Sequence, residues 1–166
     1  LNQLKAIDYS SYRNKPSVQI EQIILNGVPA NFEDESAIHE EPQTKMVAIP
    51  YMDYLEKTLL YINKGRWKQG LSRLEEILKA YPDDVNARFY AGWCYYNLQQ
   101  YQDAATNFSA CLQLEFSNFN EESMWYLAQS RLANGEKNAA KELFQTIREQ
   151  KGYYAKQAEK ALKDLK

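Results

Sequence analysis

The chain has 166 residues, a formal net charge of −2, 45% hydrophobic residues and 25% charged residues. These values are ordinary for a globular domain and contradict global disorder, and no apolar run reaches the ~20 residues that a membrane-spanning helix needs. The chain has no block of Lys and Arg that would favour nucleic acid, and its 2 cysteines are too few for a disulfide scaffold.

Residues 1–50 differ from the rest of the chain in proline content and charge. They hold 4 of the 5 prolines and have 4 basic against 7 acidic residues, whereas residues 51–166 have 16 basic against 15 acidic ones. Because each proline prevents a helix from continuing, we predict an extended arm with short elements. The expected elements are a strand or short helix at 18–25, a turn at Asn26–Gly27 and a short helix at 32–40.

From Tyr51 onward the sequence repeats itself with a period of about 34 residues. Units that begin at Tyr51, Val85 and Glu121 share small residues at two positions and apolar residues at two later ones, and a two-residue insertion near Phe119 precedes the third unit. Since one helix pair cannot bury its apolar face alone, we expect three stacked pairs. The first helices are expected at 51–64, 85–98 and 120–134, and the second helices at 67–80, 101–114 and 137–150.

This periodic pattern resembles the tetratricopeptide repeat, a 34-residue helix–turn–helix unit with Leu-Gly, Tyr, Ala, Phe and Pro at set positions. Gly92, Tyr95, Ala104 and Phe108 carry the match in the central unit, and the outer units depart further from the pattern. The resemblance implies an all-α fold, a right-handed superhelix of antiparallel helix pairs that follows the extended arm. The expected divisions are the arm at 1–50 and a helical domain at 51–166, with units 51–84, 85–118 and 121–154 and a capping helix at 154–165.

The resemblance also implies a ligand surface, because the first helices of such units line the concave side of the superhelix. One branch of the family clamps a peptide's C-terminal carboxylate with Lys and Asn, where this chain has Leu55 and Leu59, so that ligand is not expected. Apolar and aromatic residues with amides suit an apolar or aromatic peptide, or a partner helix. Trp93 is the leading candidate, because Gly92 and Tyr95 already supply the core side of its helix. The expected partner-binding residues are Leu55, Leu59, Asn86, Phe89, Trp93, Tyr96, Asn97, Trp125 and Gln129.

The sequence contains no recognisable catalytic or cofactor-binding motif. It lacks a glycine-rich phosphate loop, and His39 is its only histidine, so neither a cofactor nor a metal is expected. Cys94 and Cys111 are expected to be small buried hydrophobic residues. We therefore predict a non-catalytic protein-interaction scaffold that binds another protein or peptide. A single-stranded nucleic-acid binder is disfavoured, because the expected groove positions hold no Lys or Arg.

The apolar content of the arm leaves a second possibility open. Residues 18–25 are rich in isoleucine, and such an apolar segment is expected to be buried against another surface. The alternative prediction is a structural homo-oligomer in which the arm docks on its own or on a neighbouring helical domain. A short tether also gives a high effective concentration, so part of residues 1–50 is expected in or beside the groove, as an internal mimic of the ligand.

The C-terminal helix predicts a cellular location. The capping helix at 154–165 begins with the run Tyr153-Tyr154-Ala155-Lys156, which is similar to the Tyr/Ala/Lys-rich ends of repeat domains in bacterial cell-envelope proteins. A periplasmic or membrane-anchored location is therefore expected, with the cytoplasm as the alternative. Because residue 1 is Leu rather than Met, we expect a processed chain or a fragment, and an upstream anchor or signal peptide stays an open question.

Overall fold

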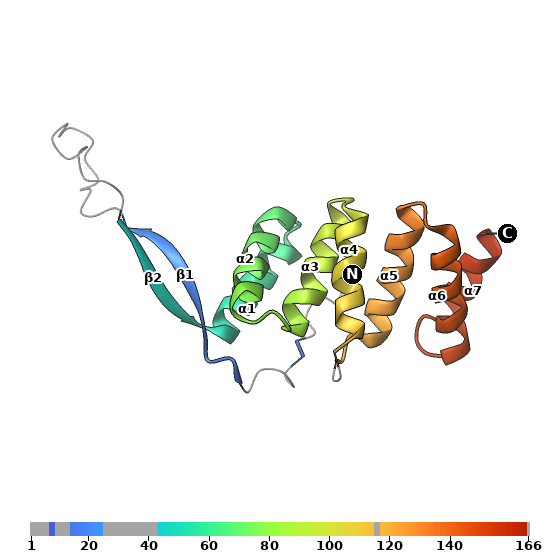
Figure 1. The fold of residues 1–166 in the computed structure, drawn as a ribbon, viewed down its shortest axis with the longest axis horizontal. Helices are drawn as coiled ribbons and strands as arrows, with labels where there is room; N and C mark the ends of the chain where they lie inside the picture. Colours follow the sequence, from blue (N-terminus) through green and yellow to red (C-terminus); the bar gives the residue numbers. More distant parts are fainter. Residues whose placement is uncertain (1–6, 9–13, 25–42, 115–116, 166) are drawn as a thin grey trace.

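The computed structural model describes residues 7–8, 14–24, 43–114 and 117–165. Within these residues, seven helices follow one another in a single row, and a two-stranded hairpin projects from the end at which α1 and α2 lie (Figure 1). The predicted helical-repeat fold is confirmed, with a small sheet in the arm. The helices are α1 (Tyr51–Asn63), α2 (Trp67–Ala80), α3 (Val85–Asn97), α4 (Tyr101–Leu112), α5 (Asn120–Ala133), α6 (Lys137–Gln150) and α7 (Ala155–Asp164). The strands are β1 (Ser17–Ile24) and β2 (Gln43–Pro50).

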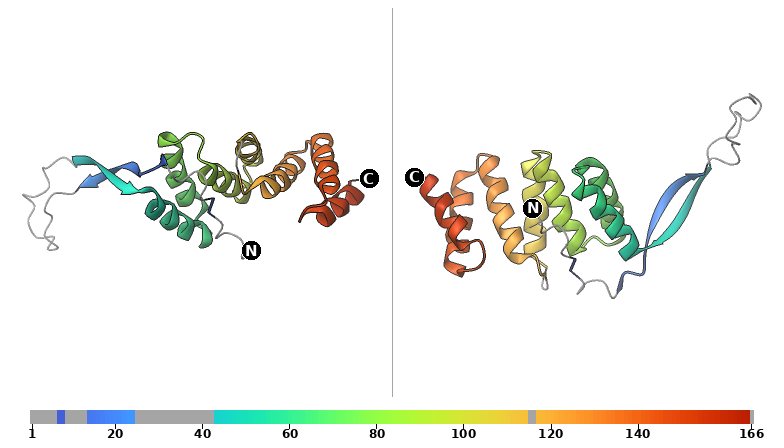
Figure 2. Two further views of the ribbon diagram at one scale, coloured as in Figure 1. Left: turned by 90° about the horizontal axis from the view of Figure 1, so that it is seen from below. Right: turned by 180° about the vertical axis from the view of Figure 1, so that it is seen from behind.

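All six paired helices begin at their predicted residues and end within two residues of the predicted ends. The turns inside the three pairs share a left-handed residue at corresponding positions, with φ of 71° at Gly65, 62° at Gln99 and 86° at Gly135. Glycine adopts this conformation without steric cost and ends many helices in this way, whereas Gln99 adopts it at some strain. Each helix packs against the next one along the chain, as the views from below and behind show (Figure 2).

Successive pairs are joined by stacked aromatic rings in two places. Phe119, which caps the start of α5, lies flat on Phe89 of α3, with ring centroids 4.3 Å apart and an interplanar angle of 4°. Tyr154 caps the start of α7 and stacks on Trp125 of α5 in the same way, at 5.2 Å and 8°. Phe89 and Trp125 occupy the same position in consecutive units. The aromatic residue just before α5 therefore covers α3, and the one just before α7 covers α5 in the same way.

A close approach of two helices in the central unit depends on a glycine. A Cβ atom on Gly92 of α3 would come within 2.9 Å of Phe108 on α4, which is closer than real Cβ contacts. The missing side chain lets the fully buried Phe108 ring lie directly against the α3 backbone.

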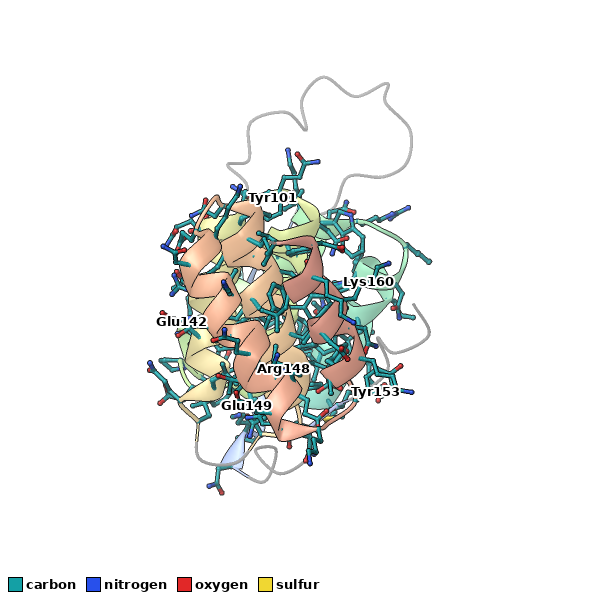
Figure 3. The ribbon with its side chains drawn as sticks, turned by 90° about the vertical axis from the view of Figure 1, so that its right-hand side faces the viewer. Tyr101, Glu142, Arg148, Glu149, Tyr153 and Lys160 are labelled. Atoms are coloured by element: carbon teal, nitrogen blue, oxygen red, sulfur yellow. The ribbon has the colours of Figure 1, made fainter. Side chains whose placement is uncertain are left out.

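The far end of the row is closed by α7, the expected capping helix. Ala158 and Leu162 are buried against α6, while Lys160 and Tyr153 face outward (Figure 3). Figure 3 also shows the charged pair Arg148 and Glu149 on this end of the molecule. The outward face of α7 thus ends the stack with polar groups.

The arm forms an antiparallel hairpin in the described residues. β1 pairs with β2 in a register that runs from Ser17 opposite Pro50 to Ile24 opposite Gln43. Val18 lies fully buried in the main apolar cluster, and β1 packs against both α1 and α2. A strand was one of the two expected forms for this stretch, whereas β2 was not predicted. The expected turn at Asn26–Gly27, the helix at 32–40 and His39 lie outside the described residues.

None of the helices in the described ranges combines the length and the apolar character that a membrane span requires.

Candidate peptide-binding surface

Four of the predicted partner-binding residues are buried in this structure. Leu55 and Asn86 have exposed fractions of 0%, and Leu59 and Phe89 of 6%. An open lining was expected at these positions, but their side chains belong to the interior. The two-residue insertion explains the case of Phe89, because it places Phe119 over that ring. The sequence signal for this cover was an aromatic residue within the insertion.

Trp125 also contributes to the stacking between units. Its indole is half-buried, stacks on Tyr154 and lies 5.5 Å from the ring of Phe144 in α6. Trp125 is therefore part of the apolar cluster that joins α5, α6 and α7.

The remaining predicted residues stay accessible and share the first helices α3 and α5. We call Trp93, Tyr96, Asn97 and Gln129 the aromatic surface; the first two and Gln129 are half-buried and Asn97 is exposed. Tyr126 of α5 packs against both aromatic rings of this surface. Its ring lies 4.7 Å from that of Trp93 and 5.9 Å from that of Tyr96, edge to face in both cases. The two aromatic side chains are thus held in place before any ligand arrives.

The aromatic surface carries neutral polar groups in place of charges. Burial raises the pKa of Tyr126 to about 12, so its phenol stays protonated at neutral pH. Asn97 donates one amide hydrogen to the backbone oxygen of Trp93 at 2.8 Å, which leaves its amide oxygen directed away from that bond. Gln129 adds a second amide. The surface can therefore combine stacking with neutral hydrogen bonds.

The N-terminal segment contacts the helical domain at Asn86, about two turns before Trp93 on α3. The backbone N–H of Asp8 donates to Oδ1 of Asn86 at 2.7 Å, and Nδ2 of Asn86 donates to the backbone oxygen of Asp8 at 3.0 Å. One carboxylate oxygen of Asp8 accepts the backbone N–H of Asn118 at 2.8 Å. Asp8 is fully buried in these contacts. Part of residues 1–50 therefore lies on a residue that was expected to face the ligand.

A buried ion pair anchors the arm a few residues later. Lys15 Nζ lies 2.7 Å from Oδ2 of Asp84, whose side chain is fully buried. The hydroxyl of Tyr51 donates to the same oxygen at 2.8 Å, while Oδ1 of Asp84 accepts the backbone N–H of Ala87 and so caps α3. Burial, and next the charge of Asp84, raise the pKa of Tyr51 well above its usual range, so this phenol remains a donor. Neither contact of Asp84 was predicted: an Asp directly before a helix is the sequence signal for the cap, whereas the pairing with Lys15 has no such signal.

The two cysteines are buried free thiols, as predicted. Burial raises the pKa of both Cys94 and Cys111 from 9.0 to about 12. Unfolding exposes these thiols, which then lose protons near pH 9, so between about pH 9 and 12 the unfolded state binds fewer protons than the folded state. The free energy of unfolding should therefore fall as the pH rises through this window, by at most about 1.4 kcal/mol per pH unit for each thiol.

Urea unfolding at about pH 8 and about pH 11 tests this expectation, with Cys94→Ala as the comparison. The variant should lose less stability between the two pH values than the unchanged chain. Equal losses would mean that Cys94 contributes nothing to the alkaline destabilisation.

Comparison with known proteins assigns the fold to a class and then to a family. The stacked helix pairs define a helical-repeat protein, and residues 55–114 and 122–150, together more than half of the chain, match models of the tetratricopeptide repeat. The chain belongs to the tetratricopeptide repeat family. No curated protein matches it in sequence.

Several solved structures are similar in fold. The type III secretion translocator chaperone SycD of Yersinia enterocolitica has a TM-score of 0.61 and 13% identity, over 69% of this chain and 81% of that one. The second TPR domain of human RPAP3, in complex with the HSP70 peptide SGPTIEEVD, has a TM-score of 0.59 and 15% identity, over 69% and 92%. The TPR2B domain of yeast Sti1, in its pHsp70 complex, has a TM-score of 0.57 and 16% identity, over 68% and 96%. At these identities the likeness concerns the fold.

Proposed function

We propose that this chain is a non-catalytic interaction scaffold that binds a peptide or a partner helix on its aromatic surface. Membership of a scaffold family supports the general class. The observation that carries the particular surface is the pair of half-buried rings, Trp93 and Tyr96, which pack against Tyr126. Half-exposed aromatic side chains on a rigid support are frequent binding hot spots, because little conformational entropy is lost when they bind.

The chemistry of the surface indicates what the ligand carries. Aromatic faces with the amides of Asn97 and Gln129 favour a peptide that offers an apolar or aromatic side chain and a backbone that can pair with an amide. A carboxylate clamp is disfavoured, because Leu55 and Leu59 are apolar and buried. The RPAP3 and Sti1 structures hold Hsp70 ligands, and this chain is proposed to use a different chemistry on the same fold.

Peptides selected on the full chain from a random library would test this proposal. Replacing Trp93 with Ala should weaken their binding by about tenfold or more, as expected of a hot-spot residue. Trp67→Ala is the matched control, because Trp67 is also half-buried but begins α2, a second helix. Circular dichroism would show that both variants remain folded. Equal affinities for the Trp93 and Trp67 variants would contradict the proposal.

A further inference from the structure

Residue 8 lies on the helical domain in the manner of a bound peptide. Both main-chain groups of Asp8 pair with the single side-chain amide of Asn86, at 2.7 and 3.0 Å. A side-chain amide that donates to the carbonyl and accepts from the N–H of one residue recognises an extended backbone, whatever side chain that residue carries. Asn86 lies on α3 seven residues, or about two turns, before Trp93. This contact therefore extends the proposed ligand surface along the same helix.

The side chains of the segment supply the specificity. The carboxylate of Asp8 accepts the backbone N–H of Asn118 at 2.8 Å, just ahead of α5, and the partly buried Ile7 packs on the main apolar cluster. A hydrogen bond to a carboxylate is stronger than one between neutral groups. Asn86, the N–H of Asn118 and the apolar contact beneath Ile7 thus form three adjoining subsites, for a backbone, an acidic group and an aliphatic group.

The arm has anchors that do not involve residues 7 and 8. Lys15 is paired with Asp84, the oxygen of Pro16 accepts the backbone N–H of Tyr51, and the backbone oxygen of Ser17 accepts the hydroxyl of Tyr81. These contacts hold the base of the hairpin against α1 and α2. Residues 7 and 8 can therefore leave their subsites while the hairpin stays attached.

We propose that these three subsites form a binding site for an extended partner peptide that carries an aliphatic residue followed by Asp, and that residues 7 and 8 are its internal ligand. The inference rests on the proposed function, since it concerns a neighbouring part of the same ligand surface. Tethering gives the internal segment an effective concentration near the millimolar range. A partner peptide must therefore out-compete it, and weakening the segment should make the site easier to occupy.

The test uses the full chain and a labelled peptide with the sequence of residues 1–14. The double variant Ile7→Ser with Asp8→Ala weakens the internal ligand and leaves Asn86 and Asn118 intact. It should bind the labelled peptide about tenfold more tightly than the unchanged chain, as measured by fluorescence anisotropy. The same peptide with Asp8→Ala should bind the variant about tenfold more weakly, because it lacks the carboxylate. The chain with Asn14→Ala, at an exposed position, should behave like the unchanged chain.

Two outcomes would overturn the inference. If the double variant binds no labelled peptide up to about 1 mM, residues 7 and 8 are a fixed part of the fold rather than an internal ligand. If the unchanged chain is a dimer in light scattering and the variant a monomer, the site belongs to a second copy of the chain. Neither outcome depends on Trp93, whose replacement should leave the binding of this peptide within about twofold. A result that contradicts this inference therefore leaves the proposed binding of a peptide on the aromatic surface unaffected.

Discussion

Replacing Lys15 with Met is expected to lower the free energy of unfolding by about 3 kcal/mol, a large fraction of the stability of a domain of this size. The substitution keeps an unbranched side chain that is one atom shorter, but it leaves the carboxylate of Asp84, whose side chain has an exposed fraction of 0%, without its cation. The expected loss lies at the low end of the range for broken buried pairs, because Tyr51 and the backbone N–H of Ala87 still donate to Asp84. Urea unfolding at neutral pH measures the change.

A surface pair gives the matched control for Lys15. Lys79 is paired with Glu76 on α2 at 2.8 Å, but its side chain is 71% exposed, so Lys79→Met should leave stability nearly unchanged. Adding Asp84→Asn to Lys15→Met should restore part of the loss, because a neutral amide needs no cation. If Lys15→Met is as stable as the unchanged chain, the ion pair does not anchor the arm.

Replacing Phe119 with Ala is expected to cost about 3–5 kcal/mol, the usual range for removing a buried aromatic side chain. Phe119 is only 3% exposed and packs flat on Phe89 and edge to face on Tyr90, at 5.9 Å. The variant loses this packing and opens Phe89 to solvent at the joint between α3 and α5. Thermal or urea unfolding would record the loss.

The control for Phe119 is an exposed aromatic residue close to the start of α7. Tyr153 lies two residues before α7 and contacts Tyr154 edge to face at 4.9 Å, yet it is 66% exposed. Tyr153→Ala should therefore cost much less, since little apolar area leaves water when it packs. Phe119→Leu should fall between the two, because leucine fills part of the space. Similar losses for Phe119→Ala and Tyr153→Ala would contradict the proposed role of the stacked rings.

The helices were predictable because their signals are local. Gly65 and Gly135 mark the turns, and the apolar spacing repeats at every unit, so each helix begins where the period places it. The strand β2 was not predictable in this way. Its residues alternate only loosely between apolar and polar, and the strand exists because Val47 and Ile49 pair with Ile20 and Val18 of β1, which lie across a long connection.

The candidate site was predictable in outline and not in detail. Family positions selected Trp93 and Tyr96 among the accessible residues, but they also selected Phe89, because a general pattern carries no information about an insertion elsewhere in the chain. The hydrogen bonds of Asp8 and Lys15 join residues that are 69 to 110 positions apart in sequence. No periodicity links Asp8 to Asn118, so only the folded structure brings them together.

These distant partners have a consequence for the order in which the chain assembles during synthesis. Asp8 and Lys15 are synthesised before the helices, but their partners at the start of α3 and just before α5 are made 69 to 110 residues later. Contacts between neighbouring helices close short loops and form quickly, whereas contacts across such separations pay a larger entropy of loop closure. The helical pairs can therefore form in the order of their synthesis, whereas Asp8 and Lys15 reach their partners only after much of the helical domain has been made.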